Sequence, residues 1–202
     1  MIINNKKYNY YLLIYIILFT LLLFITYNVS FANTGTSTGL KIPRFVSLKS
    51  NEVNLRVGPS INYPIKLKYT QNNLPIEIID EFDVWRKVKD YENNIGWLHK
   101  SLVKGERNVL IVNKDQVIKN IHNRPNGKII GGININNILN LERCLIHWCL
   151  ISHKDIKGWL SKESIWGVYK NEVYNLRFYQ PIINQYWKML DSNFVTKTLN
   201  FN

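Results

Sequence analysis

A set of aromatic and glycine residues occurs twice along the chain with nearly the same spacing. Trp85 is followed 12 residues later by the second residue of Gly96-Trp97-Leu98, and Trp148 is followed 11 residues later by that of Gly158-Trp159-Leu160. A Lys residue follows two positions after each Leu, at Lys100 and Lys162. Because self-similarity at a fixed period indicates a repeated structural unit, the sequence predicts two successive copies of one small fold. Each copy spans about 60 residues, which is enough for a small domain.

The residues of each copy favour short strands. In Val53–Val57 the apolar residues alternate with polar ones, so Val53, Leu55 and Val57 share one face of a strand. Gly58-Pro59-Ser60 then ends this strand and begins a loop. Further strand patterns occur at Ile76–Ile78 and Val84–Val88, with a turn expected at Asp80–Asp83. No stretch of this region has helical spacing over ten residues, so the expected fold class is all-β.

The landmarks upstream of the tryptophans also recur. Val53–Arg56, followed by Gly58-Pro59, corresponds to Ile118–Ile121, followed by Arg124-Pro125. In the second copy Asn120 replaces the Leu-Arg pattern, and no glycine corresponds to Gly58. The second copy therefore departs from the first at the end of its first strand.

The first copy resembles bacterial SH3 domains, in particular the tandem form of alphaproteobacterial exported proteins. The likeness rests on Asn54-Leu55-Arg56-Val57-Gly58-Pro59, Tyr63-Pro64, Trp85 and Gly96-Trp97-Leu98, and on Trp166-Gly167-Val168-Tyr169 at the end of the second copy. The resemblance covers residues 44–170 and implies two tandem SH3-like β-barrels, at 44–106 and 107–170, each five-stranded and partly open. It also implies recognition of cell-wall peptide or of an envelope protein.

The predicted ligand site lies in the first copy and comprises Arg56, Pro59, Tyr63 and Trp85. Fixed aromatic residues in so small a barrel are expected to fill the core first, which applies to Trp85, Trp97, Trp148 and Trp159. The alternative is that part of Trp85 or Tyr63 lines a groove beside the loop that begins at Gly58. That loop contains no acidic residue, so the selectivity of eukaryotic SH3 domains for proline-rich peptides is not visible.

The N-terminus has the layout of a secretory signal peptide. Lys6 and Lys7 precede an apolar run at residues 12–25, and small residues at Ser30 and Ala32 suit cleavage after Ala32. The apolar run is shorter than the ~20 residues that span a bilayer comfortably. An uncleaved membrane anchor or tether through residues 12–25 is the alternative. Either interpretation places the rest of the chain in the periplasm or cell envelope, after a polar linker at 33–43.

Cys144 and Cys149 lie in the string CLIHWC. In an oxidising compartment such a close pair favours a disulfide over a metal site, and a hairpin turn at residues 145–147 would bring the two within bridging distance. Zinc binding with His147 and His153, and a Cys–His nucleophile, are the weaker alternatives. The first copy has Glu81 and Arg86 at the aligned positions, where an exposed ion pair would be worth up to ~1 kcal/mol.

Composition narrows the partners and the chemistry. The chain has 26 Lys and Arg against 14 Asp and Glu, yet the lysines are scattered singly, so no nucleic-acid patch is visible. The carboxylates crowd around expected turns, where solvated acids are common, and no hydrolase, phosphate-binding or metal motif occurs. We therefore expect a binding protein that is not an enzyme, with no cofactor and no metal. The sequence leaves its oligomeric state open.

The tail at residues 171–202 lies outside the repeat. Ile183, Trp187 and Leu190 have helical spacing, and Pro181 suits the first turn of a helix. The pattern predicts a short amphipathic helix. We expect it to dock on the second copy, with a position on a membrane surface as the alternative.

Overall fold

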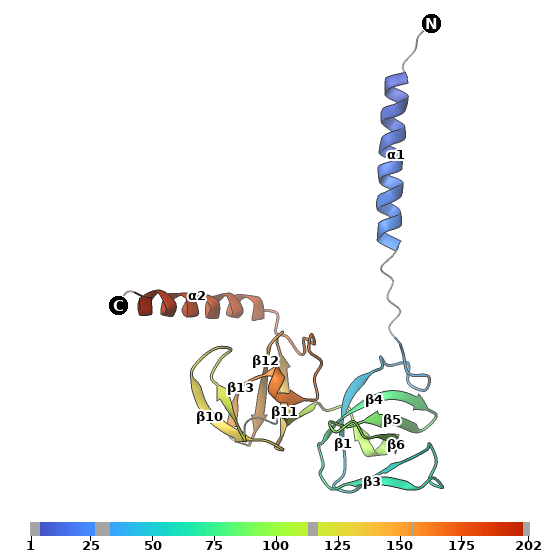
Figure 1. Cartoon of the computed structure of the whole chain (residues 1–202), viewed down its shortest axis with the longest axis vertical. Helices are drawn as coiled ribbons and strands as arrows, with labels where there is room; N and C mark the ends of the chain where they lie inside the picture. Colours follow the sequence, from blue (N-terminus) through green and yellow to red (C-terminus); the bar gives the residue numbers. More distant parts are fainter. Residues whose placement is uncertain (1–4, 27–32, 113–116, 155, 200–202) are drawn as a thin grey trace. The chain divides into compact units, whose positions relative to one another are not determined.

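The computed structural model describes residues 5–26, 33–112, 117–154 and 156–199, and side chains at 10–21, 33–112, 117–154 and 156–191. The chain divides into two compact units, residues 1–33 and residues 34–202. The first unit contains a helix, and the second contains two antiparallel β-sheets and a C-terminal helix (Figure 1). The chain is therefore mostly β, as the alternating patterns predict.

The N-terminal unit consists of helix α1, Asn5–Thr26. Its described apolar side chains, which include Tyr15 and Leu18, are largely exposed. No helix in the described part of the chain combines the length and hydrophobicity needed to cross a bilayer, the anchor considered at residues 12–25 included. The predicted cleavage site after Ala32 lies outside the described residues.

Residues 44–104 form the first sheet. Its strands are β1 (Arg44–Leu48), β2 (Val53–Arg56), β3 (Ile65–Tyr69), β4 (Pro75–Phe82), β5 (Trp85–Lys89), β6 (Ile95–His99) and β7 (Val103–Lys104). Their order in the sheet is β3-β2-β6-β5-β4-β1-β7, with all neighbours antiparallel. A single 3₁₀ turn, η1 (Lys100–Leu102), separates β6 from β7.

Residues 108–166 form the second sheet. Its strands are β8 (Asn108–Ile111), β9 (Ile118–His122), β10 (Ile129–Asn134), β11 (Ile138–Cys144), β12 (Trp148–His153), β13 (Ile156–Ser161) and β14 (Ile165–Trp166). Their order, β10-β9-β13-β12-β11-β8-β14, repeats the order of the first sheet strand for strand. The 3₁₀ turn η2 (Lys162–Ser164) also recurs. The sequence repeat is thus a repeat of topology.

Each sheet has seven strands where five were expected. One additional strand in each sheet is the two-residue strand β7 or β14, which follows the 3₁₀ turn and pairs with β1 or β8. Two residues are too few to show the alternation of apolar and polar residues by which a strand is recognised in a sequence. The turn expected at Asp80–Asp83 is also shorter than predicted, because β4 continues to Phe82. Asp83 then takes a positive φ of 47° in a tight turn.

The pairing registers define which residues of the two sheets are equivalent. Arg56 pairs with Trp97, and His122 pairs with Trp159. The correspondence of Arg56 with Ile121 expected from the sequence is therefore wrong by one position, and His122 is the equivalent residue. The correspondence of Pro59 with Pro125, expected from the sequence, has the same offset as that of Arg56 with His122.

Each sheet encloses its own cluster of buried aliphatic side chains. The first includes Leu55, Ile76, Ile78, Val88 and Leu98, and the second includes their equivalents around Ile121, Ile151 and Leu160. None of the tryptophans of the repeat belongs to the buried members of either cluster. The expectation that these aromatics fill the core is wrong for Trp85, Trp97 and Trp148, which are half-buried, whereas Trp159 is buried, at 4% exposed. Leu98 and Leu160 take the inward positions, so the adjacent Trp97 and Trp159 point to the opposite side.

The two sheets pack directly on one another. Phe45 of β1 contacts the rings of Trp166 and Tyr169, at centroid distances of 5.1 and 4.8 Å. Trp166 donates to the carbonyl of Pro75, and Leu110 of β8 joins the buried cluster of the first sheet. Residues of β8 and β14, together with Tyr169 after the second sheet, therefore also pack against the first sheet.

Helix α2, Gln180–Leu199, confirms the helix predicted in the tail and is longer than expected. Pro181 lies in its first turn, where a missing backbone N–H costs no helical hydrogen bond. Three contacts place the helix on the second sheet: Gln180 with Arg143, Trp187 with Trp159, and Asp191 with Arg124. The docked position is the one that the amphipathic spacing favoured.

Candidate binding face

The first sheet presents a group of aromatic and cationic side chains on the side opposite its core. Along β5 and β6 the buried residues alternate with half-buried ones, which lie on the outer side. We call the outer group the first Trp face. It comprises Arg56, Trp85, Lys87, Trp97 and His99.

Strand pairing holds this group together. Trp97 lies between Arg56 on β2 and Lys87 on β5, and Trp85 is paired with His99. The Lys87 ammonium lies 5.9 Å from the centre of the Trp97 ring, and the Trp85 and His99 rings meet edge to face at 5.7 Å. The face therefore offers flat apolar surface beside positive charge, a combination that binds aromatic and acidic groups.

The loop after β2 borders this face. Arg56 donates from Nη1 to the carbonyl of Tyr63 at 2.7 Å, which ties the loop to the strand. A Cβ at Gly58 would lie 2.6 Å from the Tyr63 ring, so only glycine fits beneath that ring. Tyr63 is 46% exposed and Pro59 is half-buried. The loop thus holds its aromatic ring in a fixed place at the surface.

The predicted ligand residues are only partly brought together. Arg56 contacts Tyr63, Pro59 lies in the same loop, and Trp85 is on the same side of the sheet with β6 between it and Arg56. Sequence reasoning missed Trp97, which lies beside Arg56. The signal was present in Gly96-Trp97-Leu98: in a strand, adjacent residues point to opposite sides, so Trp97 and Leu98 cannot both be in the core.

The equivalent group on the second sheet is the second Trp face, comprising His122, Trp148, Leu150, Trp159 and Ser161. The His122 and Trp148 rings meet edge to face at 5.0 Å. His122 Nδ1 lies 2.8 Å from the carbonyl of Gly127, so His122 ties its loop to the strand as Arg56 does. The two faces share their tryptophans and differ in charge.

Helix α2 covers the second Trp face. The Trp187 ring packs edge to face on Trp159 at 5.5 Å, and Asp191, one helical turn later, accepts a hydrogen bond of 2.6 Å from Arg124. Trp159 is only 4% exposed, whereas the equivalent Trp97 is half-buried. The second face is thus occupied from within the chain, and among the described residues no helix lies on the first.

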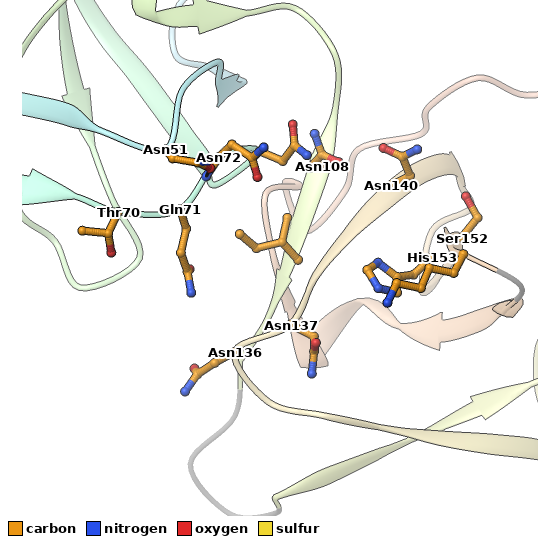
Figure 2. A pocket seen from close by; sticks show the side chains of 13 residues that line it. Asn51, Thr70, Gln71, Asn72, Asn108, Asn136, Asn137, Asn140, Ser152 and His153 are labelled. Atoms are coloured by element: carbon orange, nitrogen blue, oxygen red, sulfur yellow. Dashed lines mark hydrogen bonds between the residues drawn. The ribbon is translucent and has the colours of Figure 1, made fainter.

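A cleft of about 520 Å³ is lined largely by asparagines (Figure 2). Several of these asparagines adopt turn conformations of the backbone or form local hydrogen bonds. Asn73 and Asn136 adopt positive φ values of 62° and 65°, which asparagine tolerates better than most residues. Asn108 donates to Ser47 at 3.0 Å, and Asn137 donates to the carbonyl of Asn134 at 3.1 Å. The asparagine content of this cleft therefore largely reflects turn structure.

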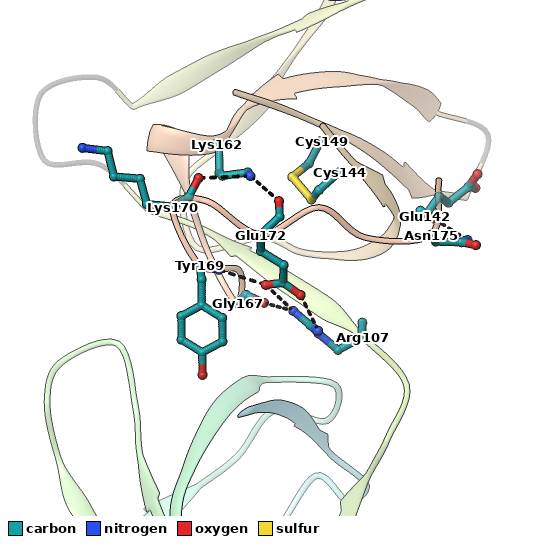
Figure 3. The surroundings of a disulfide bond; sticks show 10 residues. All are labelled: Arg107, Glu142, Cys144, Cys149, Lys162, Gly167, Tyr169, Lys170, Glu172 and Asn175. Carbon is teal, nitrogen blue, oxygen red and sulfur yellow. Dashed lines mark hydrogen bonds and ion pairs between the residues drawn. A yellow bond between two sulfur atoms is a disulfide. The ribbon is translucent and has the colours of Figure 1, made fainter. Parts of the chain in front are cut away.

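The predicted disulfide between Cys144 and Cys149 is present, with both cysteines fully buried (Figure 3). It closes the hairpin at residues 145–147, as expected, so neither sulfur is free for zinc or for a nucleophilic role. Nearby, Lys162 donates to the carbonyls of Glu172 and Lys170 at 2.7 and 3.2 Å. Burial lowers the pKa of Lys162.

The pair aligned with the cysteines, Glu81 and Arg86, is buried, so the value of up to ~1 kcal/mol for an exposed pair does not apply to it. Glu81 accepts from Arg44 at 2.5 Å and from the backbone N–H of Thr38 at 2.9 Å. Burial alone would raise the pKa of Glu81, but the hydrogen bonds from Arg44 and Thr38 and the charges of Arg44 and Arg86 lower it. The segment expected as a linker at 33–43 supplies part of this cage. The carboxylate is structural.

Comparison with known families adds one match. Residues 49–105 match the family model of the bacterial SH3 domain, which spans β2 to β7 and includes the whole first Trp face. Comparison with curated proteins gives no match. The matched segment coincides with the copy in which the SH3 pattern of Arg56, Gly58 and Trp97 was complete. Residues 49–105 of this chain are a bacterial SH3 domain.

Proposed function

We propose that this chain is an exported, non-catalytic binding protein of the bacterial cell envelope. In this proposal it recognises cell-wall peptide or an envelope protein through two tandem SH3-like barrels. The observation that carries the proposal is the open first Trp face within a bacterial SH3 domain. Binding through aromatic and arginine side chains is typical of protein and peptide recognition.

The second sheet supports the tandem part of the proposal. It repeats the strand order of the first sheet and the pairings around Trp97 and Trp85. The export part rests on the positive and apolar N-terminal segment and on the buried disulfide, because disulfides persist in oxidising compartments. Mass spectrometry of the protein from its native envelope tests export, since it reports whether the chain starts at Asn33 and whether Cys144 and Cys149 are oxidised.

The surroundings of the buried and half-buried carboxylates favour binding over catalysis. Glu81 is held by two arginines, the half-buried Glu172 accepts from Arg107 at 2.8 Å, and Glu77 forms an ion pair with Lys89 at 2.7 Å. A general acid or base must be available to exchange a proton with a substrate, and these carboxylates are engaged by cationic side chains of the chain itself. These groups therefore serve packing.

A sedimentation assay with purified peptidoglycan tests wall recognition. We expect the full chain to sediment with peptidoglycan at low salt, and Trp97→Ala to remain in the supernatant. Phe178→Ala is the matched control, because Phe178 is an aromatic residue that is 95% exposed outside the face. A wild-type chain that stays in the supernatant excludes wall binding.

The alternative is a scaffold that holds an envelope protein or a separate wall hydrolase. The observation in its favour is that the second Trp face already binds a helix. Crosslinking in cells through a photoreactive residue at position 97 tests it. Crosslinks to one protein support the scaffold function, and crosslinks to wall fragments alone speak against it.

A further inference from the structure

We infer that the first Trp face binds an amphipathic α-helix of a partner protein, which presents an aromatic side chain together with carboxylates on the same side of the helix. The inference rests on the proposed binding function and names the class of partner for that site. It is carried by the other half of the molecule, where such a helix is already in place.

The two faces are equivalent position by position. Trp97 and Trp159 each lie at the centre, paired on one side with Arg56 or His122 and on the other with Lys87 or Leu150. Trp85 and Trp148 occupy the same next position along β5 and β12. A surface that accommodates a helix on one sheet therefore has the same strand geometry on the other.

The occupant of the second face shows which features of a helix fit. Trp187 contacts Trp159, and Asp191, four residues later on the same side of α2, pairs with Arg124. Side chains four residues apart point in the same direction from a helix. The recognised element is thus an aromatic ring with a carboxylate one turn beyond it.

The first face carries more positive charge than the second, so its partner helix should differ from α2 in charge. The first face carries Arg56 and Lys87 where the second carries His122 and Leu150, and none of its five residues is acidic. Arg124, which binds the carboxylate of α2, is replaced by Gly58 at the equivalent position. A partner helix would therefore direct its carboxylates toward Arg56 and Lys87, and it should be more acidic than α2.

The probe is a synthetic peptide with the sequence of residues 180–199 in which Lys188 and Lys197 are replaced by Glu. A photoreactive phenylalanine analogue takes the place of Trp187. We expect light-dependent crosslinks from this peptide to residues 85–99 of the full chain. Crosslinks confined to the second sheet, or none, would overturn the inference.

Affinity of the same peptide, with its tryptophan restored, gives the second readout. Removing a central interface tryptophan commonly weakens binding by about 30-fold or more, so we expect that loss for Trp97→Ala. Lys87→Glu is the companion variant, because Lys87 is half-buried on the outer side of the sheet and not in the core, and its charge reversal should weaken binding at least about fivefold. Phe178→Ala should bind as the wild type does. Equal affinity for Lys87→Glu and the wild type contradicts the inference.

The outcomes separate this inference from the proposed function. If Trp97→Ala abolishes sedimentation with peptidoglycan while the peptide does not bind, the face recognises the wall and the helix inference fails. If the peptide binds through Trp97 and peptidoglycan does not, the helix inference holds and wall recognition fails. If neither binds, both fail.

Discussion

The hairpins β4–β5 and β11–β12 differ in how their strands are linked near the turn, by an ion pair in the first and by a disulfide in the second. Glu81 pairs with Arg86 in the first, and Cys144 pairs with Cys149 at the same register in the second. Both pairs lie on the buried side of their hairpins. One position near the end of a small sheet is therefore closed by an ion pair in one copy and by a covalent bond in the other.

The ion pair requires much more of its surroundings. Arg44, Ser37 and Thr38 donate to the Glu81 carboxylate, because a buried charge must be paired and hydrogen-bonded. The segment around Tyr174 lies beside the disulfide in the equivalent place. The backbone N–H and C=O of Tyr174 both form hydrogen bonds with the backbone of Cys144. Arg107, the equivalent of Arg44, binds Glu172 instead (Figure 3). A disulfide at this position carries no charge, so the second hairpin does not need the hydrogen-bond donors that surround Glu81 in the first.

Removal of Glu81 should have the largest effect. Glu81→Ala leaves Arg44 and Arg86 without their common partner, and breaking a buried ion pair from one side costs about 3–5 kcal/mol. Urea unfolding should show this loss, and hydrogen exchange should place it in β4 and β5. Glu52→Ala is the control, since its ion pair with Lys68 is exposed and should cost under about 1 kcal/mol. Equal losses for the two variants would contradict a buried role.

Removal of the disulfide should cost less. The loop that it closes is short, with a sequence separation of 5, so Cys144→Ala with Cys149→Ala should lower the free energy of unfolding by about 2 kcal/mol. The same urea experiment measures it. If removing the disulfide lowers the free energy of unfolding more than Glu81→Ala does, the expected order of the two effects is wrong.

Acid should weaken the packing around Glu81 in the first hairpin. Because the folded pKa of Glu81 is below its ordinary value of 4.5, its ionised form stabilises the fold above that pH, and this stabilisation is lost as the pH falls through the folded pKa. The effect should be smaller than that of Glu81→Ala, because a protonated carboxyl still fills the site. The stability difference between wild type and Glu81→Ala, followed in urea from neutral to acidic pH, should narrow. A constant difference would argue against the pairing.

The smallest effect is expected where α2 meets the second sheet. Arg124 and Asp191 are partly exposed, so Asp191→Asn should reduce stability by about 0.2–1 kcal/mol. Increased hydrogen exchange in α2, with no change in β4 or β5, is the expected signature. Unchanged exchange in α2 would show that the contacts of Trp187 and Gln180 hold the helix without the ion pair.

Local pattern predicted those features that depend on residues close in sequence. The cysteines of CLIHWC are near enough that one tight turn brings them together, so their disulfide could be predicted. The helix around Trp187 followed from its periodic spacing and Pro181. The fate of Glu81 could not be predicted in the same way, because its burial depends on Arg44 and Thr38, which reach it from 37 and 43 residues away.

The sequence by itself determined that one motif occurs twice, that its copies are β, and that the first is an SH3 domain, because these properties follow from short-range alternation and fixed landmarks. Only the tertiary structure decided which side of each strand is buried. It placed Leu98 inward and Trp97 outward, and it showed that α2 covers one tryptophan face while leaving the other open. The physical reason is that alternation specifies two faces of a strand, and only packing with distant segments assigns one of them to the core.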